Sequence, residues 1–245
     1  MIRPVITLDI DWAPDVAIDF AADLLATAGA KATWFVTHAS PAVDRLRQRP
    51  DLFELGIHPN FLPRSSHGTT PEEVLDYCMK LVPDAVSMRT HSLVQSTPLL
   101  ATVLARTPVR CDATMLLSHA KRTEPFEYQW GGTTMLRVPY HWEDDIEMIR
   151  DVPKFSLDDA IAGEGLRVFD FHPIHVFLNS ADMKPYEGLK SAVKPLNEAT
   201  LEAMQPFVYN GAGSRTVFEA LAKYAGAHGG GERIGDIYNA WKAGR

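Results

Sequence analysis

Residues 5–12 read VITLDIDW, and this stretch near the start of the chain decides both the predicted fold and the predicted chemistry. Its first six residues are mostly apolar or β-branched, which predicts a buried strand. Asp9 and Asp11 stand two positions apart at the end of that strand, and side chains at this spacing project from the same face. Two like charges in an interior strand are costly unless a partner compensates them. The pair is therefore either a helix cap with a turn aspartate, or a general base beside a metal ligand.

Similar apolar runs recur along the chain and alternate with helical patterns. The predicted strands are residues 5–10, 32–37, 53–57, 85–88, 109–111, 135–138 and 166–171. The predicted helices are residues 14–28, 41–49, 70–81, 97–106, 156–162, 216–224 and 236–242. This alternation predicts an α/β fold with about seven parallel strands in a closed or nearly closed barrel. Residues 113–134 suggest a hairpin arm, and residues 176–213 are long enough to form a lid or an insertion.

The composition excludes several classes of protein. The 245 residues are 46% hydrophobic, which fits one large α/β domain over residues 1–245. The net charge of −7 argues against a nucleic-acid partner, because no basic patch is available for phosphates. Cys78 and Cys111 are too few for a disulfide framework or a cysteine zinc cluster. No apolar run reaches the roughly 18 residues of a membrane span and no secretory signal precedes the first strand, so we expect a cytoplasmic protein.

Side chains that titrate or bind metals follow most of the predicted strands, and in barrels of this type the carboxyl ends of the strands carry the site. These residues are Asp9, Asp11, His38, His58, Arg89, His91, Asp112, Tyr140, His141, His172 and His175. Each alone has an ordinary structural explanation, but one Asp and two His form a ligand set suited to zinc or a similar divalent ion. Such a metal activates water and polarises a carbonyl, while a second carboxylate and a further histidine move protons. The combination predicts metal-assisted hydrolysis of an acyl bond.

Five short motifs resemble, in the same order, those of the polysaccharide deacetylases with a NodB-homology domain (carbohydrate esterase family four). They are TLDID at residues 7–11, GIH at 56–58, MRTH at 88–91, CDAT at 111–114 and FDFH at 169–172. The stretches HPNFLP from His58 and HPIHVFLN from His172 are most similar to the WbmS-like branch, from bacterial surface-polysaccharide gene clusters. The resemblance covers residues 6–179 and implies a distorted barrel with a bound metal, usually zinc.

The resemblance also implies catalytic roles by matching position. Asp9 would be the general base, and Arg89 would hold it ionised, because an adjacent cation favours the charged form of a carboxyl group. His172 would be the general acid, and Asp112 would orient and charge it. The metal and a backbone N–H after Arg89 would share the oxyanion.

Asp11 and His58 are the metal ligands that the resemblance implies, and the third ligand departs from the family's pattern. The second motif of the family has two histidines four apart on a helical turn, whereas position 62 is a leucine here and the proline after His58 disfavours a helix. His67, in the following loop, is the predicted replacement, and His91 and His175 are the reserve candidates. The first motif of the family has adjacent aspartates, and the strand spacing here keeps both carboxylates on one face.

Tyr140 and Trp142, with His91 and His175, are the residues expected to bind substrate. Aromatic rings at such positions stack on sugars, although they pack in cores at least as often. The predicted protein is a hydrolase that uses a divalent metal ion, Zn²⁺ being the expected one. The resemblance implies that it removes an N-acetyl or N-formyl group from an amino sugar during surface-polysaccharide assembly, so the expected partner is a carbohydrate.

Two rival functions remain open. The first is a catalytically inactive barrel of the same fold that binds carbohydrate or serves as a scaffold. The second is a barrel isomerase or aldolase that acts on a sugar phosphate and needs a glycine-rich phosphate turn before a helix. Residues 211–214, GAGS, are a weak candidate for that turn and fit an ordinary loop and cap better.

Overall fold

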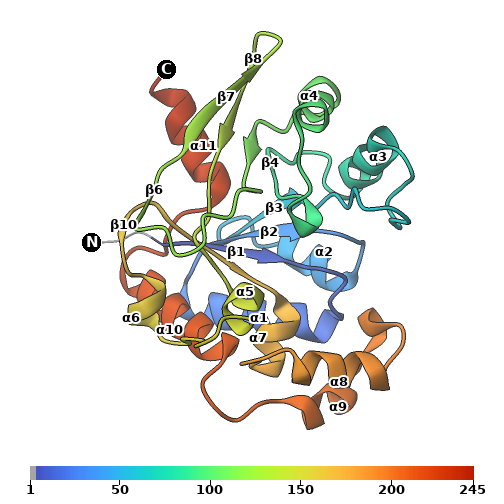
Figure 1. Ribbon diagram of the computed structural model, residues 1–245, viewed down its shortest axis with the longest axis vertical. Helices are drawn as coiled ribbons and strands as arrows, with labels where there is room; N and C mark the ends of the chain where they lie inside the picture. Colours follow the sequence, from blue (N-terminus) through green and yellow to red (C-terminus); the bar gives the residue numbers. More distant parts are fainter. Residues whose placement is uncertain (1–3) are drawn as a thin grey trace.

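β1 (Pro4–Asp9) lies in the interior of a nine-stranded sheet in the computed structural model, which describes residues 4–245 (Figure 1). The strand order is β7-β8-β5-β4-β3-β2-β1-β11-β9, and neighbouring strands are parallel except for the hairpin β7–β8. The other strands of this sheet are β2 (Ala32–Val36), β3 (Phe53–Ile57), β4 (Ser87–Met88), β5 (Cys111–Asp112), β7 (Phe126–Trp130), β8 (Thr133–Arg137), β9 (Trp142–Glu143) and β11 (Arg167–Phe171). A separate parallel pair joins β6 (Arg122–Thr123) to β10 (Glu164–Gly165).

Helices connect the strands and cover the sheet. They are α1 (Asp15–Ala28), α2 (Pro41–Arg47), α3 (Pro71–Leu81), α4 (Thr97–Arg106), α5 (Asp144–Met148), α6 (Leu157–Ala160), α7 (Pro173–Leu178), α8 (Lys184–Ala192), α9 (Leu201–Met204), α10 (Ser214–Ala227) and α11 (Ile234–Ala243). Short 3₁₀ turns span His91–Leu93, Leu196–Glu198 and Gln205–Phe207. Local sequence explains several helix starts: Thr70 and Glu73 form the predicted capping box of α3, and Ser40 caps α2.

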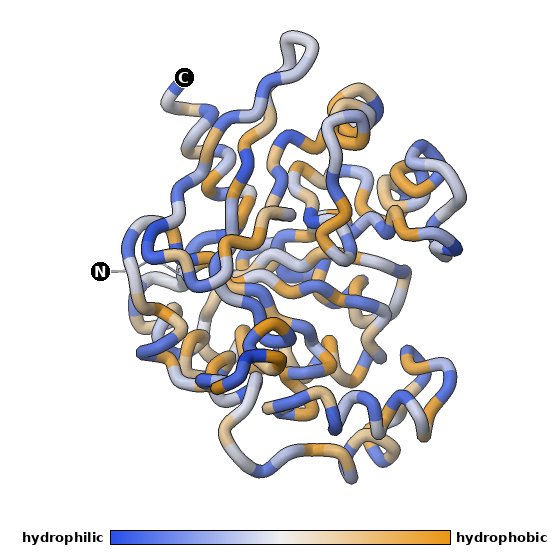
Figure 2. Tube along the Cα trace, viewed as in Figure 1, coloured by the Kyte–Doolittle hydropathy of each residue, from blue (hydrophilic) through white to orange (hydrophobic). Residues whose placement is uncertain are grey.

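The two faces of the sheet have different partners. On β1, Ile6 and Leu8 point to the outer face, where they join the large core formed with α1, α3, α4, α7 and α10. Along α3 and α4, hydrophobic and hydrophilic residues alternate, as expected for helices with one buried side (Figure 2). Val5 points to the opposite, inner face, where a smaller core includes Phe35 and Tyr140 and is closed by α11. Thr7 and Asp9 share the inner face with Val5, because side chains alternate along a strand.

The predicted α/β distorted barrel is confirmed, as a curled and mostly parallel sheet that stops short of closure at its edge strands β7 and β9. The seven predicted strands correspond to β1, β2, β3, β4, β5, β8 and β11. The suspected arm in residues 113–134 is the hairpin β7–β8, which turns at Gly131 and Gly132 with positive φ angles. Residues 176–213 carry α8, which lies beside α7, and α9 (Figure 1).

The helices of this fold pack against the sheet. Within residues 4–245, none is both long enough and apolar enough to traverse a bilayer.

Candidate active site

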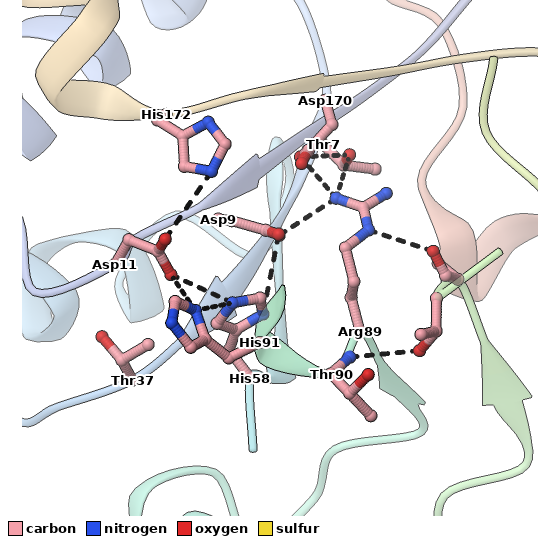
Figure 3. Close-up of polar contacts among 12 residues, drawn as sticks. Thr7, Asp9, Asp11, Thr37, His58, Arg89, Thr90, His91, Asp170 and His172 are labelled. Atoms are coloured by element: carbon pink, nitrogen blue, oxygen red, sulfur yellow. Dashed lines mark hydrogen bonds and ion pairs between the residues drawn. The ribbon is translucent and has the colours of Figure 1, made fainter. Parts of the chain in front are cut away.

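Functional side chains converge where four parallel strands end (Figure 3). Asp9 is the last residue of β1, while His58, Arg89 and His172 directly follow β3, β4 and β11. Parallel neighbours end at the same edge of a sheet, so residues 80 positions apart in the chain become neighbours here.

Asp11, His58 and His91 form the group best arranged to hold a metal ion. Asp11 Oδ1 lies 3.0 Å from His58 Nε2 and 3.0 Å from His91 Nδ1, and the two nitrogens are 3.3 Å apart. In a tetrahedral zinc site with bonds of about 2.0–2.1 Å, the ligand atoms are roughly 3.3 Å from one another. The three atoms therefore have the spacing of three corners of such a site, and one carboxylate with two imidazoles is a donor set that zinc prefers.

A sharp backbone turn after β1 presents Asp11 to the two histidines. Asp11 and Trp12 both have left-handed backbones, with φ of 44° and 54°, which is uncommon and costly for residues other than glycine. The turn is held by the Trp12 N–H, which donates to Thr37 Oγ1 over 3.2 Å. The Trp12 ring then packs edge-on against His91, with 5.2 Å between ring centroids. The strained turn thus fixes Asp11 directly and supports His91 through the ring of Trp12.

The pKa shifts of Asp11 and His91 show that this group favours an ionised Asp11, which can bind a cation. Desolvation opposes the ionisation of Asp11, but hydrogen bonds with His58 and His91 outweigh it and lower the pKa of Asp11 well below its usual range. Desolvation likewise opposes a charge on His91, and the hydrogen bond with Asp11 outweighs it, so the pKa of His91 is raised. A metal ion would displace the proton that the Asp11 carboxylate favours on His91.

Arg89 lies beside Asp9, within the inner face of the sheet. Its Nη1 donates to Asp9 Oδ1 over 3.0 Å, and its guanidinium lies between the rings of Phe35 and Tyr140, at 4.8 Å and 4.3 Å from their centroids. Burial opposes the charge of Arg89, but Asp170 and Asp9 outweigh it and raise the pKa of Arg89 above its usual value. Asp9 therefore faces a permanently charged cation.

His172 is charged by Asp144, not by Asp112 as the motif order implied. Asp144 Oδ1 is 2.8 Å from His172 Nδ1, and Asp144 Oδ2 accepts from the His172 backbone N–H and from the Ser214 hydroxyl. Burial opposes the charge on His172, but Asp144 outweighs it, so the pKa of His172 is raised well above its usual value. An imidazolium held this way is ready to donate its other proton from Nε2.

The side chain of Asp112 points to the outer face of the sheet, which is why it does not contact His172. It pairs with Arg137 across 2.7 Å and accepts from the backbone N–H of Thr114 over 3.0 Å. Its neighbour Cys111 occupies the inner face, and four strands separate β5 from β11, so its carboxylate cannot reach His172. Asp112 therefore stabilises a buried arginine.

His67 lies outside the group formed by Asp11, His58 and His91. His91 occupies the ligand position that was predicted for His67. His67 Nδ1 accepts from the Asn60 N–H over 3.2 Å, and its ring stacks on Tyr77 with 4.6 Å between centroids. Burial lowers the pKa of His67 to about 4. Its ring also contacts Trp12 at 5.4 Å, so within residues 4–245 it supports the turn that carries Asp11, while the group around Asp11 contains His91.

The other residues expected to bind substrate are buried. Tyr140 donates its hydroxyl to Glu143 Oε2 over 2.8 Å, and Trp142 packs on Phe171 with 4.9 Å between centroids. His175 Nδ1 is 3.1 Å from Ser180 Oγ, and its ring lies 5.7 Å from that of His172. Tyr140 therefore packs beside Arg89 in the inner core and Trp142 packs in the outer core, so neither ring is exposed for stacking on a sugar. His175 contacts His172.

The backbone N–H groups after Arg89 are already engaged. The Thr90 N–H donates to Thr114 Oγ1 over 3.1 Å, and the His91 N–H donates to the Pro59 carbonyl over 3.0 Å. Neither is directed at a substrate oxygen, which corrects the expected oxyanion donor.

Comparison with known proteins identifies the family. The family model for WbmS-like polysaccharide deacetylases matches residues 6–190. The chain belongs to this family.

A solved WbmS from Bordetella bronchiseptica, described as a polysaccharide deacetylase involved in O-antigen biosynthesis, is 36% identical with a TM-score of 0.81. The match covers 91% of this chain and 90% of that one. A family 4 acetyl xylan esterase from Clostridium thermocellum, solved with a cobalt ion, is 14% identical with a TM-score of 0.45, over 97% of this chain and 91% of that one. None of the curated proteins matches. The family match and the Bordetella structure confirm the predicted resemblance and the predicted deacetylase-type hydrolase.

Two other groups in this WbmS-like deacetylase place carboxylates near His172. Asp9 and Asp170 form one of them with His172, but both carboxyl groups already contact the cation of Arg89. In the other, Glu143 and Asp145 lie close together, and burial followed by the charge of Asp145 raises the pKa of Glu143 to about 8. Neither group matches Asp11, His58 and His91, whose three ligand atoms converge without an arginine or lysine among the described contacts.

Sequence reasoning missed Asp144 and Asp170. Asp144 lies in the acidic run at residues 143–145, which resembles a solvated turn until β9 and α5 bury its middle member. Asp170 is the polar residue in the apolar strand segment FDF at 169–171, two positions before His172. That spacing puts it on the inner face with His172, and this signal was available from the sequence.

Proposed function

We propose that this chain is a metal-dependent hydrolase that removes an N-acetyl or N-formyl group from an amino sugar. The carrying observation is the convergence of Asp11 Oδ1, His58 Nε2 and His91 Nδ1 at 3.0–3.3 Å from one another. Zn²⁺ is the proposed ion, because the ligands are two imidazoles and one carboxylate at tetrahedral spacing. When bound, such an ion supplies Lewis acidity and makes water a nucleophile near neutral pH.

The chain's own groups divide the proton transfers between two sides of the site. Asp9 Oδ1 is held by Arg89, and Asp9 Oδ2, which lies 3.7 Å from His58 Nδ1, takes the proton of the attacking water. On the other side, His172 Nδ1 is held by Asp144, so Nε2 presents its proton to the departing amine nitrogen. His172 Nε2 lies 3.7 Å from Asp11 Oδ2, so the acid borders the proposed metal group.

The proposed setting follows the Bordetella relative, which is described as involved in O-antigen biosynthesis. By analogy, we place the substrate among the N-acylated sugars of a surface polysaccharide and the reaction in the cytoplasm. The fold alone does not determine the sugar, since sites on one fold serve many substrates.

Elemental analysis combined with a release assay tests the proposal. The purified chain should carry about one divalent metal per site and should release acetate or formate from a panel of N-acylated nucleotide sugars. A chelator should abolish the release, and re-addition of zinc should restore it. Sugar binding without metal and without acid release would instead support an inactive carbohydrate-binding barrel.

A further inference from the structure

Asp170 is a buried carboxyl group for which the proposed reaction has no role, yet it contacts the arginine that holds the proposed base. Its side chain is 0% exposed, and Oδ1 accepts a short hydrogen bond from Arg89 Nη1. Its Oδ2 is buried and has no hydrogen-bond partner within residues 4–245. Burying a carboxyl group with an unpartnered oxygen costs free energy, so its contact with Arg89 requires an explanation.

Thr7 completes the arrangement from the neighbouring strand. Thr7 is directly opposite Asp170 in the β1–β11 register, and its Oγ1 lies 3.0 Å from Asp170 Oδ1. The same hydroxyl oxygen accepts from Arg89 Nη1 over 2.9 Å and donates to the Phe169 carbonyl over 2.7 Å. The contact is therefore fixed by backbone register as well as by side chains (Figure 3).

One nitrogen of Arg89 thus serves three acceptors with two hydrogens. Nη1 faces Asp9 Oδ1, Asp170 Oδ1 and Thr7 Oγ1, whereas Nε donates to the Ala113 carbonyl over 3.0 Å and the buried Nη2 has no hydrogen-bond partner in the described chain. The ring contacts and the Nε bond restrain the plane of the guanidinium. The N–H donors of a guanidinium are fixed in its plane, so the acceptors at Nη1 set the in-plane position of the whole group relative to Asp9.

We propose that Asp170 is a positioning residue that, with Thr7, directs Nη1 of Arg89 so that one of its hydrogens stays on Asp9. Burial, which outweighs the attraction of Arg89, raises the pKa of Asp170 well above its usual range. Through Oδ1, Asp170 offers Nη1 an acceptor, so that Nη1 is held beside Asp9 Oδ1. This role rests on the proposed function, because it matters for turnover only if Asp9 is the base.

The test compares Asp170→Ala, which removes the acceptor, with Asp170→Asn, which keeps it without a charge. We expect Asp170→Ala to lower kcat about 30-fold with KM within threefold, since small misplacements of catalytic groups cost up to about 100-fold. Asp170→Asn should recover most of this loss, and metal content should match wild type in both variants. Glu54→Gln is the matched control, because Glu54 is another inner-face carboxyl, held by Ser87 over 2.7 Å and Thr33 over 3.0 Å, and should leave kcat unchanged.

A second readout separates this proposal from the proposed function. In the metal-free chain, the side-chain Nε–Hε NMR signal of Arg89, assigned by its absence in Arg89→Lys, should move or broaden in Asp170→Ala but not in Asp170→Asn or Glu54→Gln. If wild type releases no acid while this signal behaves as expected, the proposed function fails and the positioning role stands. If Asp170→Ala does not fold, Thr7→Val replaces it, with Thr7→Ser as its rescue.

An unchanged Arg89 signal and unchanged kcat in Asp170→Ala would overturn the positioning role. A loss of kcat as large in Asp170→Asn as in Asp170→Ala would also overturn it, because it would show that charge and not hydrogen-bond geometry matters.

Discussion

Two clusters of titratable side chains lie at the ends of the parallel strands, and their charges are compensated in opposite ways. Around Arg89, Asp9 and Asp170 contact a cation that the chain itself supplies, and the side chains of Arg89 and Asp170 are 0% exposed. Around Asp11, which is 25% exposed, two histidines converge on one oxygen and no arginine or lysine accompanies them among the described contacts. The first cluster is complete by itself, whereas the second is arranged for a cation from solution. Substitutions in the Arg89 cluster and in the Asp11 cluster should therefore separate the loss of base chemistry from the loss of metal binding.

The largest expected effects on turnover come from substitutions at Asp9 and at His58. Asp9→Asn should retain metal, because Asp9 belongs to the completed cluster, but should lower turnover by about 10³-fold, within the range of a lost general base. His58→Ala should lose both metal and turnover. Elemental analysis and acid release on the same samples give the answer, and wild-type metal content with wild-type activity in His58→Ala would contradict the metal assignment.

The next effect contrasts the two buried aspartates that the motif order confused. Asp144→Asn should lower kcat by about 10²-fold, because His172 would lose the carboxylate that keeps it protonated. Asp112→Asn should leave kcat within threefold but cost about 3 kcal/mol of stability, since Arg137 would remain buried without its charge partner. Kinetics at 20 °C and urea unfolding of both variants measure the difference, and the reverse pattern would restore the motif assignment.

A smaller effect separates the two histidines that compete for the third ligand position. Loss of supporting groups around a metal already weakens affinity by about 10–100-fold, so loss of the ligand in His91→Gln should weaken zinc binding at least 100-fold. His67→Gln should weaken it by only about 10-fold, because His67 packs on the turn that carries Asp11 but its ring nitrogens are not in the ligand group. Competition titration with a zinc chelator measures both constants. Equal losses would show that His67 is needed at the metal.

The smallest expected effect is on stability in acid. The pKa of His67 is about 4 in the folded chain, against about 6.5 when unfolded, so the unfolded state binds the proton first as pH falls. The contribution of neutral His67 is present above pH 6.5 and is lost as pH falls towards 4. Between pH 7 and pH 5, wild type should therefore lose about 2 kcal/mol more stability than His67→Gln. Urea unfolding at both pH values tests this, and parallel losses in the two proteins would refute it.

Much of the site was predictable because strand periodicity is a local property. The two-residue spacing of Asp9 and Asp11 and the strands before His58, Arg89 and His172 placed these residues at one edge of a parallel sheet, where the structure has them. The same periodicity separates the faces, so it indicated that Asp170 accompanies His172, although the sequence did not reveal its contact with Arg89.

The choices between similar residues were not predictable. His67 and His91 are equally plausible ligands by type, and the choice between them depends on the left-handed turn at Asp11 and on the Asn60 N–H that occupies His67. Asp112 and Asp144 are both buried aspartates, and the choice between them depends on which face of which strand meets His172. Such contacts join segments 28 to 80 residues apart, where propensity carries no information.

The sequence by itself determined the alternating α/β barrel, the edge at which the chemistry lies and the residue types that perform it. Patterns of burial repeat every two or four residues and can be read along the chain. The tertiary structure alone decided the partners: His91 with Asp11, Asp144 with His172, and one nitrogen of Arg89 for Asp9, Asp170 and Thr7. The physical reason is that hydrogen bonds and ligand sets depend on distances of a few ångströms, which only the packing of distant segments defines.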